Sequence, residues 1–91
     1  MRVENMTGKN GRAIPNQFIL FTPEATFFQS YNSIIVKTTF EDGRKVIYFD
    51  ETYWDYSNTT RNYRNQFLGE TSAETKQKIK SGEYKLVNLN Q

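Results

Sequence analysis

Hydrophobic and polar residues alternate in short runs through the first half of the chain, a pattern typical of β-strands. Runs of strand-forming residues cover positions 17–22, 26–31, 33–40 and 44–50, and turn-forming residues separate them. Residues 1–16 are polar and rich in turn formers. They fit either a hairpin with a broad loop or a loose N-terminal arm.

The Asp42-Gly43 pair is the strongest hairpin signal in the sequence. A two-residue loop there places Glu41 opposite Arg44, whereas a three-residue loop through Glu41 would shift one strand and mix its faces. The two-residue loop gives the cleaner separation of hydrophobic from polar side chains, so we expect one buried face and one partly solvent-exposed face. The expected buried face carries Val36, Thr38, Phe40, Ile47 and Phe49, and the other carries Ile35, Lys37, Thr39, Val46 and Tyr48.

After residue 56 the spacing becomes helical. Ser57, Asn58 or Thr59 supplies a capping oxygen for a short helix over residues 60–68, and Gly69 ends it. Trp54, Tyr63 and Phe67 are expected in the core, because so thin a core needs rings.

A second short helix follows over residues 73–81. Thr71-Ser72-Ala73-Glu74 matches a capping box, and Glu74 and Lys78 form an expected ion pair on the outer side of this helix. Residues 83–89 then alternate enough to predict a final strand, with Tyr84, Leu86 or Val87 buried.

These elements predict a single α+β domain spanning residues 1–91. Its small antiparallel sheet of four to five strands is packed by two short helices, and the final strand returns to the sheet. Only 36% of the residues are hydrophobic and 15% are aromatic, so the core is thin and built largely from rings. No run of residues is apolar enough to span a membrane.

The chain has no Cys and no His. This composition excludes disulfides, thiolate zinc sites, cysteine nucleophiles and the Ser–His pair. Asp50, Glu51 and Asp55 form an acidic group, which we interpret as solvated charges at the end of a strand rather than a metal site. Gly8-Lys9-Asn10-Gly11 has the form of a GxxG nucleic-acid clamp, but its flanks look extended, so an ordinary turn is expected.

Rings and arginines alternate between residues 53 and 64, an arrangement that suits stacking of single-stranded nucleic acid and also the centre of a protein interface. The net charge is only +2, so any charged surface must arise by clustering in the fold. Three lysines could add phosphate contacts to this segment, although a solvated charged face is the plainer interpretation. The candidate binding residues are Tyr53, Tyr56, Arg61, Arg64, Lys76, Lys80 and Lys85.

Several segments between residues 16 and 69 resemble a group of small uncharacterised proteins encoded by tailed bacteriophages and prophages. The group often carries a His one turn into the first helix, near the position of Tyr63 here. The resemblance implies a viral setting in the host cytoplasm and a role in binding. The segments that carry it are Asn16-Gln17-Phe18, Phe28-Gln29-Ser30-Tyr31-Asn32-Ser33-Ile34-Ile35, Trp54-Asp55-Tyr56-Ser57-Asn58-Thr59-Thr60 and Phe67-Leu68-Gly69.

Two classes of function remain. The first is a non-enzymatic module that binds nucleic acid through Arg, Lys and exposed Tyr, without cofactor or metal. The second is an inhibitor or adaptor that binds a host or phage protein, such as a component of host defence or replication. Homodimerisation is compatible with both, because a thin sheet with an open edge gains by pairing.

Overall fold

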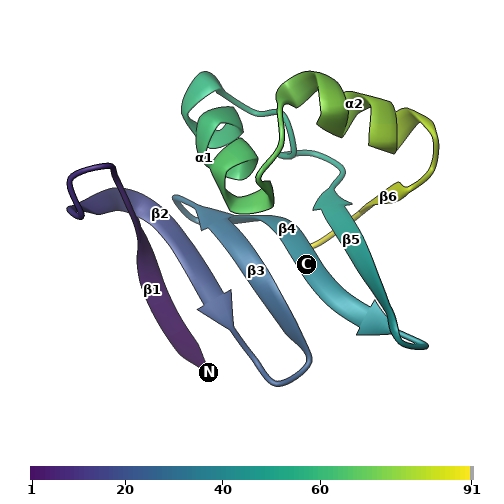
Figure 1. Cartoon of the computed structure of the whole chain (residues 1–91), viewed down its shortest axis with the longest axis horizontal. Coiled ribbons are helices and arrows are strands. Elements are labelled where there is room, and N and C mark those ends of the chain that lie inside the picture. Colours follow the sequence, from purple (N-terminus) through teal and green to yellow (C-terminus); the bar gives the residue numbers. More distant parts are fainter. Residues whose placement is uncertain (91) are drawn as a thin grey trace.

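The computed structural model describes residues 1–90 as a six-stranded sheet with two helices on one of its faces (Figure 1). The strands lie in chain order, and each of the first four is antiparallel to the next, whereas β6 pairs with β5 in parallel. The elements are β1 Arg2–Thr7, β2 Ala13–Phe21, β3 Ala25–Ser30, β4 Ser33–Glu41, β5 Arg44–Asp50, α1 Asn58–Leu68, α2 Ser72–Lys80 and β6 Tyr84–Val87.

The predicted α+β class is confirmed, but the sheet has six strands rather than the four to five expected, and it is mixed rather than antiparallel because β6 joins in parallel. Residues 1–16 do not form a loose arm, because β1 pairs with β2 along the whole of β1 apart from one bulge at Met6. The second strand also begins at Ala13 rather than at residue 17.

The Asp42-Gly43 hairpin has the predicted register. Glu41 lies opposite Arg44, and Val36 lies opposite Phe49. Asp42 and Gly43 both have positive φ, at 53° and 78°, which is the geometry of the type I′ turn that such sequences favour.

Two side chains of β4 depart from the predicted burial. Phe40 was expected in the core but is 72% exposed, because it lies opposite Lys45 at the end of the sheet that the helices do not reach (Figure 1). Ile35 was expected on the partly solvent-exposed face but is 1% exposed. It is the extra residue of a β-bulge, since Phe28 pairs with Val36 and the next residue of β3 pairs with Ile34.

Both helices begin and end at the polar residues that the sequence offers. Ser57 is the N-cap of α1, and its Oγ accepts a hydrogen bond from the amide of Thr60 at 3.1 Å. Gly69, with φ of 71°, ends that helix. The capping box of Thr71 and Glu74 at the start of α2 is confirmed.

The core lies between the sheet and the helices and is mostly aromatic. Phe28 of β3 stacks on Phe67 of α1 at 5.8 Å between ring centroids. Phe49 of β5 contacts both Trp54 and Tyr84, at 6.2 and 5.1 Å. Tyr63 also packs against this cluster, in agreement with the sequence analysis.

Glu70, in the link between the helices, ties α2 to β6. Its carboxylate accepts hydrogen bonds from Thr75, from Lys78 at 3.0 Å and from the Tyr84 hydroxyl at 2.6 Å. Lys78 therefore pairs with Glu70 instead of the expected Glu74, which is used in the cap. Burial alone would raise the pKa of Glu70, but the three donors outweigh it and lower that pKa. Burial and the neighbouring carboxylate raise the pKa of Tyr84 to about 12.

The different burial of two phenylalanines on the same face of the sheet predicts a contrast in stability. Phe49→Ala should lower the free energy of unfolding by about 3–5 kcal/mol, because a fully buried ring is lost. Phe40→Ala should change it by only about 0.5 kcal/mol, because that ring is exposed. Denaturant unfolding of both variants tests this, and equal losses would contradict the burial of Phe49 and the exposure of Phe40.

The Glu70 contacts predict an acid-dependent loss of stability. A lowered folded pKa means that the contribution is complete above the ordinary value of 4.5 and is lost as the pH falls from there through the folded pKa. Glu70→Gln should therefore be less stable at neutral pH and should show a shallower loss between neutral and acid pH. Parallel stability curves for the two proteins would argue against this role.

Candidate functional site

Asp50 fixes the turn that follows β5. Its side chain is 1% exposed, and its Oδ2 accepts hydrogen bonds from the amides of Thr52 and Tyr53 at 3.0 and 2.8 Å. Its Oδ1 accepts another from the amide of Leu89 at 2.9 Å. Burial alone would raise the pKa of Asp50, but the hydrogen bonds from these amides and from Asn90 outweigh it and lower the pKa. Asp50 is thus a buried structural group, not the solvated charge that the sequence suggested.

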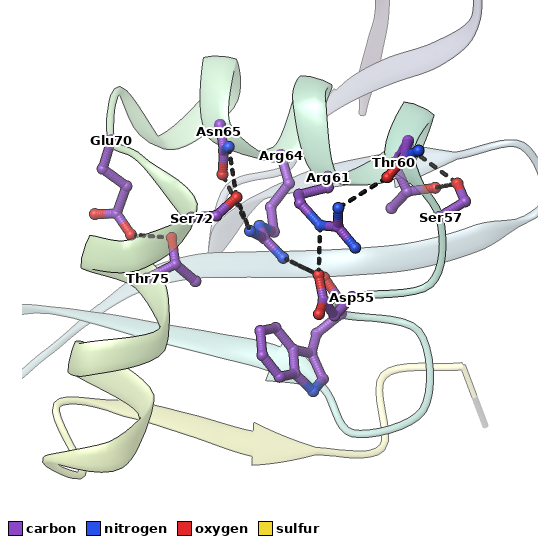
Figure 2. Close-up of polar contacts among 11 residues, drawn as sticks. Asp55, Ser57, Thr60, Arg61, Arg64, Asn65, Glu70, Ser72 and Thr75 are labelled. Atoms are coloured by element: carbon purple, nitrogen blue, oxygen red, sulfur yellow. Dashed lines mark hydrogen bonds and ion pairs between the residues drawn. The ribbon is translucent and has the colours of Figure 1, made fainter.

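Arg64 of α1 is the second anchor of this turn, and it is fully buried. Its guanidinium donates to the carbonyl of Trp54 at 2.7 Å and lies 3.4 Å from Asp55 Oδ1. The other end of the fork donates to Asn65 and to Ser72 of α2 (Figure 2). A planar fork of donors can hold three segments at once in this way. Burial lowers the pKa of Arg64, opposed by the charge of Asp55.

Arg61 lies one turn earlier on α1 and is partly exposed. Its Nε donates to Asp55 Oδ1 at 2.8 Å, and its Nη1 donates to Asn58 at 2.8 Å (Figure 2). Burial alone would raise the pKa of Asp55, but the hydrogen bond from Arg61 and the charges of both arginines outweigh it and lower that pKa. The carboxylate of Asp55 is therefore held by two guanidinium groups.

A pocket of about 410 Å³ lies beside this turn, between the start of α1 and the turn that joins β3 to β4. Three tyrosines line it. Tyr31 comes from the β3–β4 turn, and Tyr53 and Tyr56 come from the turn after β5. The rings of Tyr53 and Tyr56 meet edge to face at 5.5 Å. The remaining lining residues are Ser30, Asn32, Ser33, Ile35 and Thr60, and we call the whole set the tyrosine pocket.

A buried hydrogen bond joins the wall of the tyrosine pocket where α1 meets the sheet. Ser30 of β3 and Thr60 of α1 are both buried, and their hydroxyl oxygens lie 3.0 Å apart in a hydrogen bond. The outer rings are accessible, since Tyr31 is 52% exposed and Tyr56 is 69% exposed. A flat ring system can therefore enter between fixed walls and exposed aromatic faces.

Tyr31 is the residue of this pocket that the sequence analysis missed. Its φ is 55°, a left-handed conformation that bulky residues seldom adopt, and its amide donates to Asn16 at 2.7 Å. Backbone strain of this kind gathers at binding sites. Tyr31 was counted in the strand-forming run 26–31, whereas β3 ends at Ser30 and Tyr31 lies in a two-residue turn, which only the turn former Asn32 signals in the sequence.

The predicted site residues do not form one surface. Tyr53 and Tyr56 share the tyrosine pocket, and Arg61 lies on the adjoining turn of α1. Arg64 is corrected from a contact residue to an internal one, because its guanidinium is covered and held by the protein. The three lysines are exposed on other elements, Lys76 and Lys80 on α2 and Lys85 on β6.

The three carboxylates of the acidic group have separate surroundings. Asp50 is bound to backbone amides, Asp55 is bound to two arginines, and Glu51 is exposed. Across residues 1–90 no three acidic side chains gather as a metal ion would need.

Neither of the two helices in that range is long and apolar enough to cross a membrane.

Comparison with known proteins gives one match. A model of a family of unknown function, DUF8033, matches residues 1–83, which covers everything up to the start of β6. No curated protein matches the chain. No solved structure matches it either.

The two arginines of α1 should differ sharply in their effect on stability. Arg64→Ala should lower the free energy of unfolding by about 3–5 kcal/mol, because it removes the fully buried partner of the ion pair with Asp55 and leaves the part-buried carbonyl of Trp54 without its donor. Arg61→Ala should lower it by about 1 kcal/mol or less, as is usual for a partly exposed pair.

Chemical unfolding at neutral pH measures both losses. Arg64→Lys is the matched control, because it keeps the charge and loses the planar fork, and it should also be destabilised. Similar values for Arg61→Ala and Arg64→Ala would show that Arg64 does not anchor the turn.

Proposed function

We propose that this chain, which belongs to the family of unknown function DUF8033, is a non-enzymatic module that binds single-stranded nucleic acid. The observation that carries the proposal is the convergence of Tyr31, Tyr53 and Tyr56 on one pocket. Exposed rings that stack on unpaired bases are the usual means of holding a single strand without reading a fixed sequence. In this proposal the tyrosine pocket takes one unstacked base.

The chemistry of the neighbouring groups supports a binding role rather than a catalytic one. Asp50, Asp55 and Glu70 all have lowered pKa values, because structural donors stabilise their charged forms. A general base that works near neutral pH needs a raised carboxylate pKa. Asp50 and Asp55 maintain the turn beside the tyrosine pocket, and Glu70 joins α2 to β6.

The setting that we propose follows the resemblance to phage and prophage proteins. A short accessory protein in the host cytoplasm meets single-stranded nucleic acid during replication and transcription of a viral genome. The basic sequence pI, about 8.9, favours such a polyanionic partner.

A protein partner is the second candidate, and one observation favours it. No Lys or Arg lines the tyrosine pocket, and Arg61 beside it is already paired with Asp55. An uncharged aromatic pocket also suits an apolar anchor side chain of a partner protein. In this alternative the protein is an inhibitor or adaptor that acts on a host or phage protein.

Titration of a labelled oligothymidylate and a labelled oligouridylate tests the first proposal. Tyr56→Ala should weaken binding between about fivefold and 150-fold, the range for loss of one stacked base. Tyr56→Phe should retain the affinity, because the ring remains. Phe40→Ala is the matched control, since it removes an exposed ring at the opposite end of β4.

Two outcomes would reject nucleic-acid binding at this pocket. Affinity weaker than about 1 mM at low salt for every oligonucleotide would remove the function itself. Equal weakening by Tyr56→Ala and Phe40→Ala would show that the pocket takes no base. The second candidate would be established if the wild type binds a specific host protein but no oligonucleotide, and the Tyr56→Ala variant no longer binds that host protein.

A further inference from the structure

Both helices cover the same face of the sheet, so no helix or strand of residues 1–90 packs on the opposite face (Figure 1). Side chains alternate along each strand, and the core residues Phe28, Val36 and Phe49 fix which face is covered. Their neighbours Phe27, Lys37 and Tyr48 therefore point to the other side, which we call the open face.

One row of register partners crosses all six strands on the open face. The pairing runs from β1 to β6 without a break, and successive members lie directly opposite one another. In order, the members of this cross-strand row are Val3, Leu20, Phe27, Lys37, Tyr48 and Lys85. Rings and cations alternate over its last four positions.

The side chains of the cross-strand row are available to a ligand. Val3 is 53% exposed, Lys85 is exposed, and the four between them are half-buried by one another. The Nζ of Lys37 lies 5.6 Å from the centroid of the Tyr48 ring, so the ammonium stays beside the aromatic surface. Phe27 and Tyr48 stand two strands apart, about 10 Å.

The charges on this face call for an anionic partner. Lys37, Arg44 and Lys85 are its cations, and Glu41 lies on the same face opposite Arg44. Glu41 already accepts a hydrogen bond from the Tyr48 hydroxyl at 2.6 Å, and that contact raises the pKa of Tyr48. A second copy laid over the row would bury lysines without free carboxylates to pair with them, which is costly. A nucleic acid supplies phosphates and bases together.

We infer that the open face is a platform for single-stranded nucleic acid, with bases stacked on Phe27 and Tyr48 and phosphates held by Lys37 and Lys85. The inference rests on the proposed function and adds a surface distinct from the tyrosine pocket. A strand that follows the row crosses the β-strands, and each ring lies next to a cation that can meet the adjacent phosphate.

Anisotropy titration of a labelled oligothymidylate at two salt concentrations tests the platform. Phe27→Ala and Tyr48→Ala should each weaken binding between about fivefold and 150-fold. Lys37→Gln and Lys85→Gln should each lower the slope of log affinity against log salt by about 0.7. Lys45→Gln and Phe40→Ala, which pair on the covered side, are the matched controls, and both should bind as the wild type does.

Tyr48→Phe is the control for unfolding of the Tyr48→Ala variant. It keeps the aromatic ring and should therefore keep the affinity for the oligonucleotide. Wild-type binding that survives all four row variants would overturn the platform and leave the tyrosine pocket as the site. Absence of wild-type binding would overturn the proposed function together with the platform. Sedimentation of the wild type as a dimer that Phe27→Ala converts to monomer would assign the open face to a second copy and overturn the inference.

Discussion

The site depends on the hydrogen bonds that the buried guanidinium of Arg64 donates to the turn between β5 and α1. The turn between β5 and α1 has no regular hydrogen-bond ladder of its own, so other groups must set its conformation. Arg64 holds the carbonyl of Trp54 and the side chain of Asp55 from one side and reaches Ser72 of α2 from the other. Each of these contacts compensates part of the cost of removing the charge from water. An internal side chain thus holds the turn that carries Tyr53 and Tyr56.

The second constraint is the small amount of apolar material. Helices of 11 and 9 residues are the only second layer that the described chain builds over six strands. They cover the central part of one face and leave the hairpin end of β4 and β5 bare. The sheet stays ordered on its other side because half-buried side chains in neighbouring strands shield each other. A surface that would be core in a sandwich is therefore left available for a ligand.

Local chemistry made much of the fold predictable from the sequence. Asp42-Gly43 specifies a turn with positive φ, and the capping residues of both helices satisfy the first free amides wherever the helices pack. Such features are properties of a few neighbouring residues. The β3–β4 bulge has no comparable signal, so the burial of Ile35 was not foreseen.

Burial that depends on distant segments was harder to predict. Phe40 fits the buried pattern of its strand, but whether it is covered depends on how far the helices extend. Arg64 was taken for a surface cation because its partners come from a turn, from its own helix and from the next helix. The tyrosine pocket was predicted only in part for a similar reason. Tyr53 and Tyr56 are close in sequence and were both predicted, whereas Tyr31 is brought next to them only by the pairing of the strands.

The parallel pairing of β6 with β5 has a consequence for the order of folding. The first five strands pair with their sequence neighbours and can form as successive hairpins. In contrast, β6 can pair with β5 only after residues 51–83 have crossed over the sheet. Until then the edge of β5 is unpaired, and Asp50 lacks the amide of Leu89. The turn that carries Tyr53 and Tyr56 thus gains its contact with Leu89 in the final step of folding. A partly synthesised chain therefore has the sheet of the first five strands but lacks the complete tyrosine pocket.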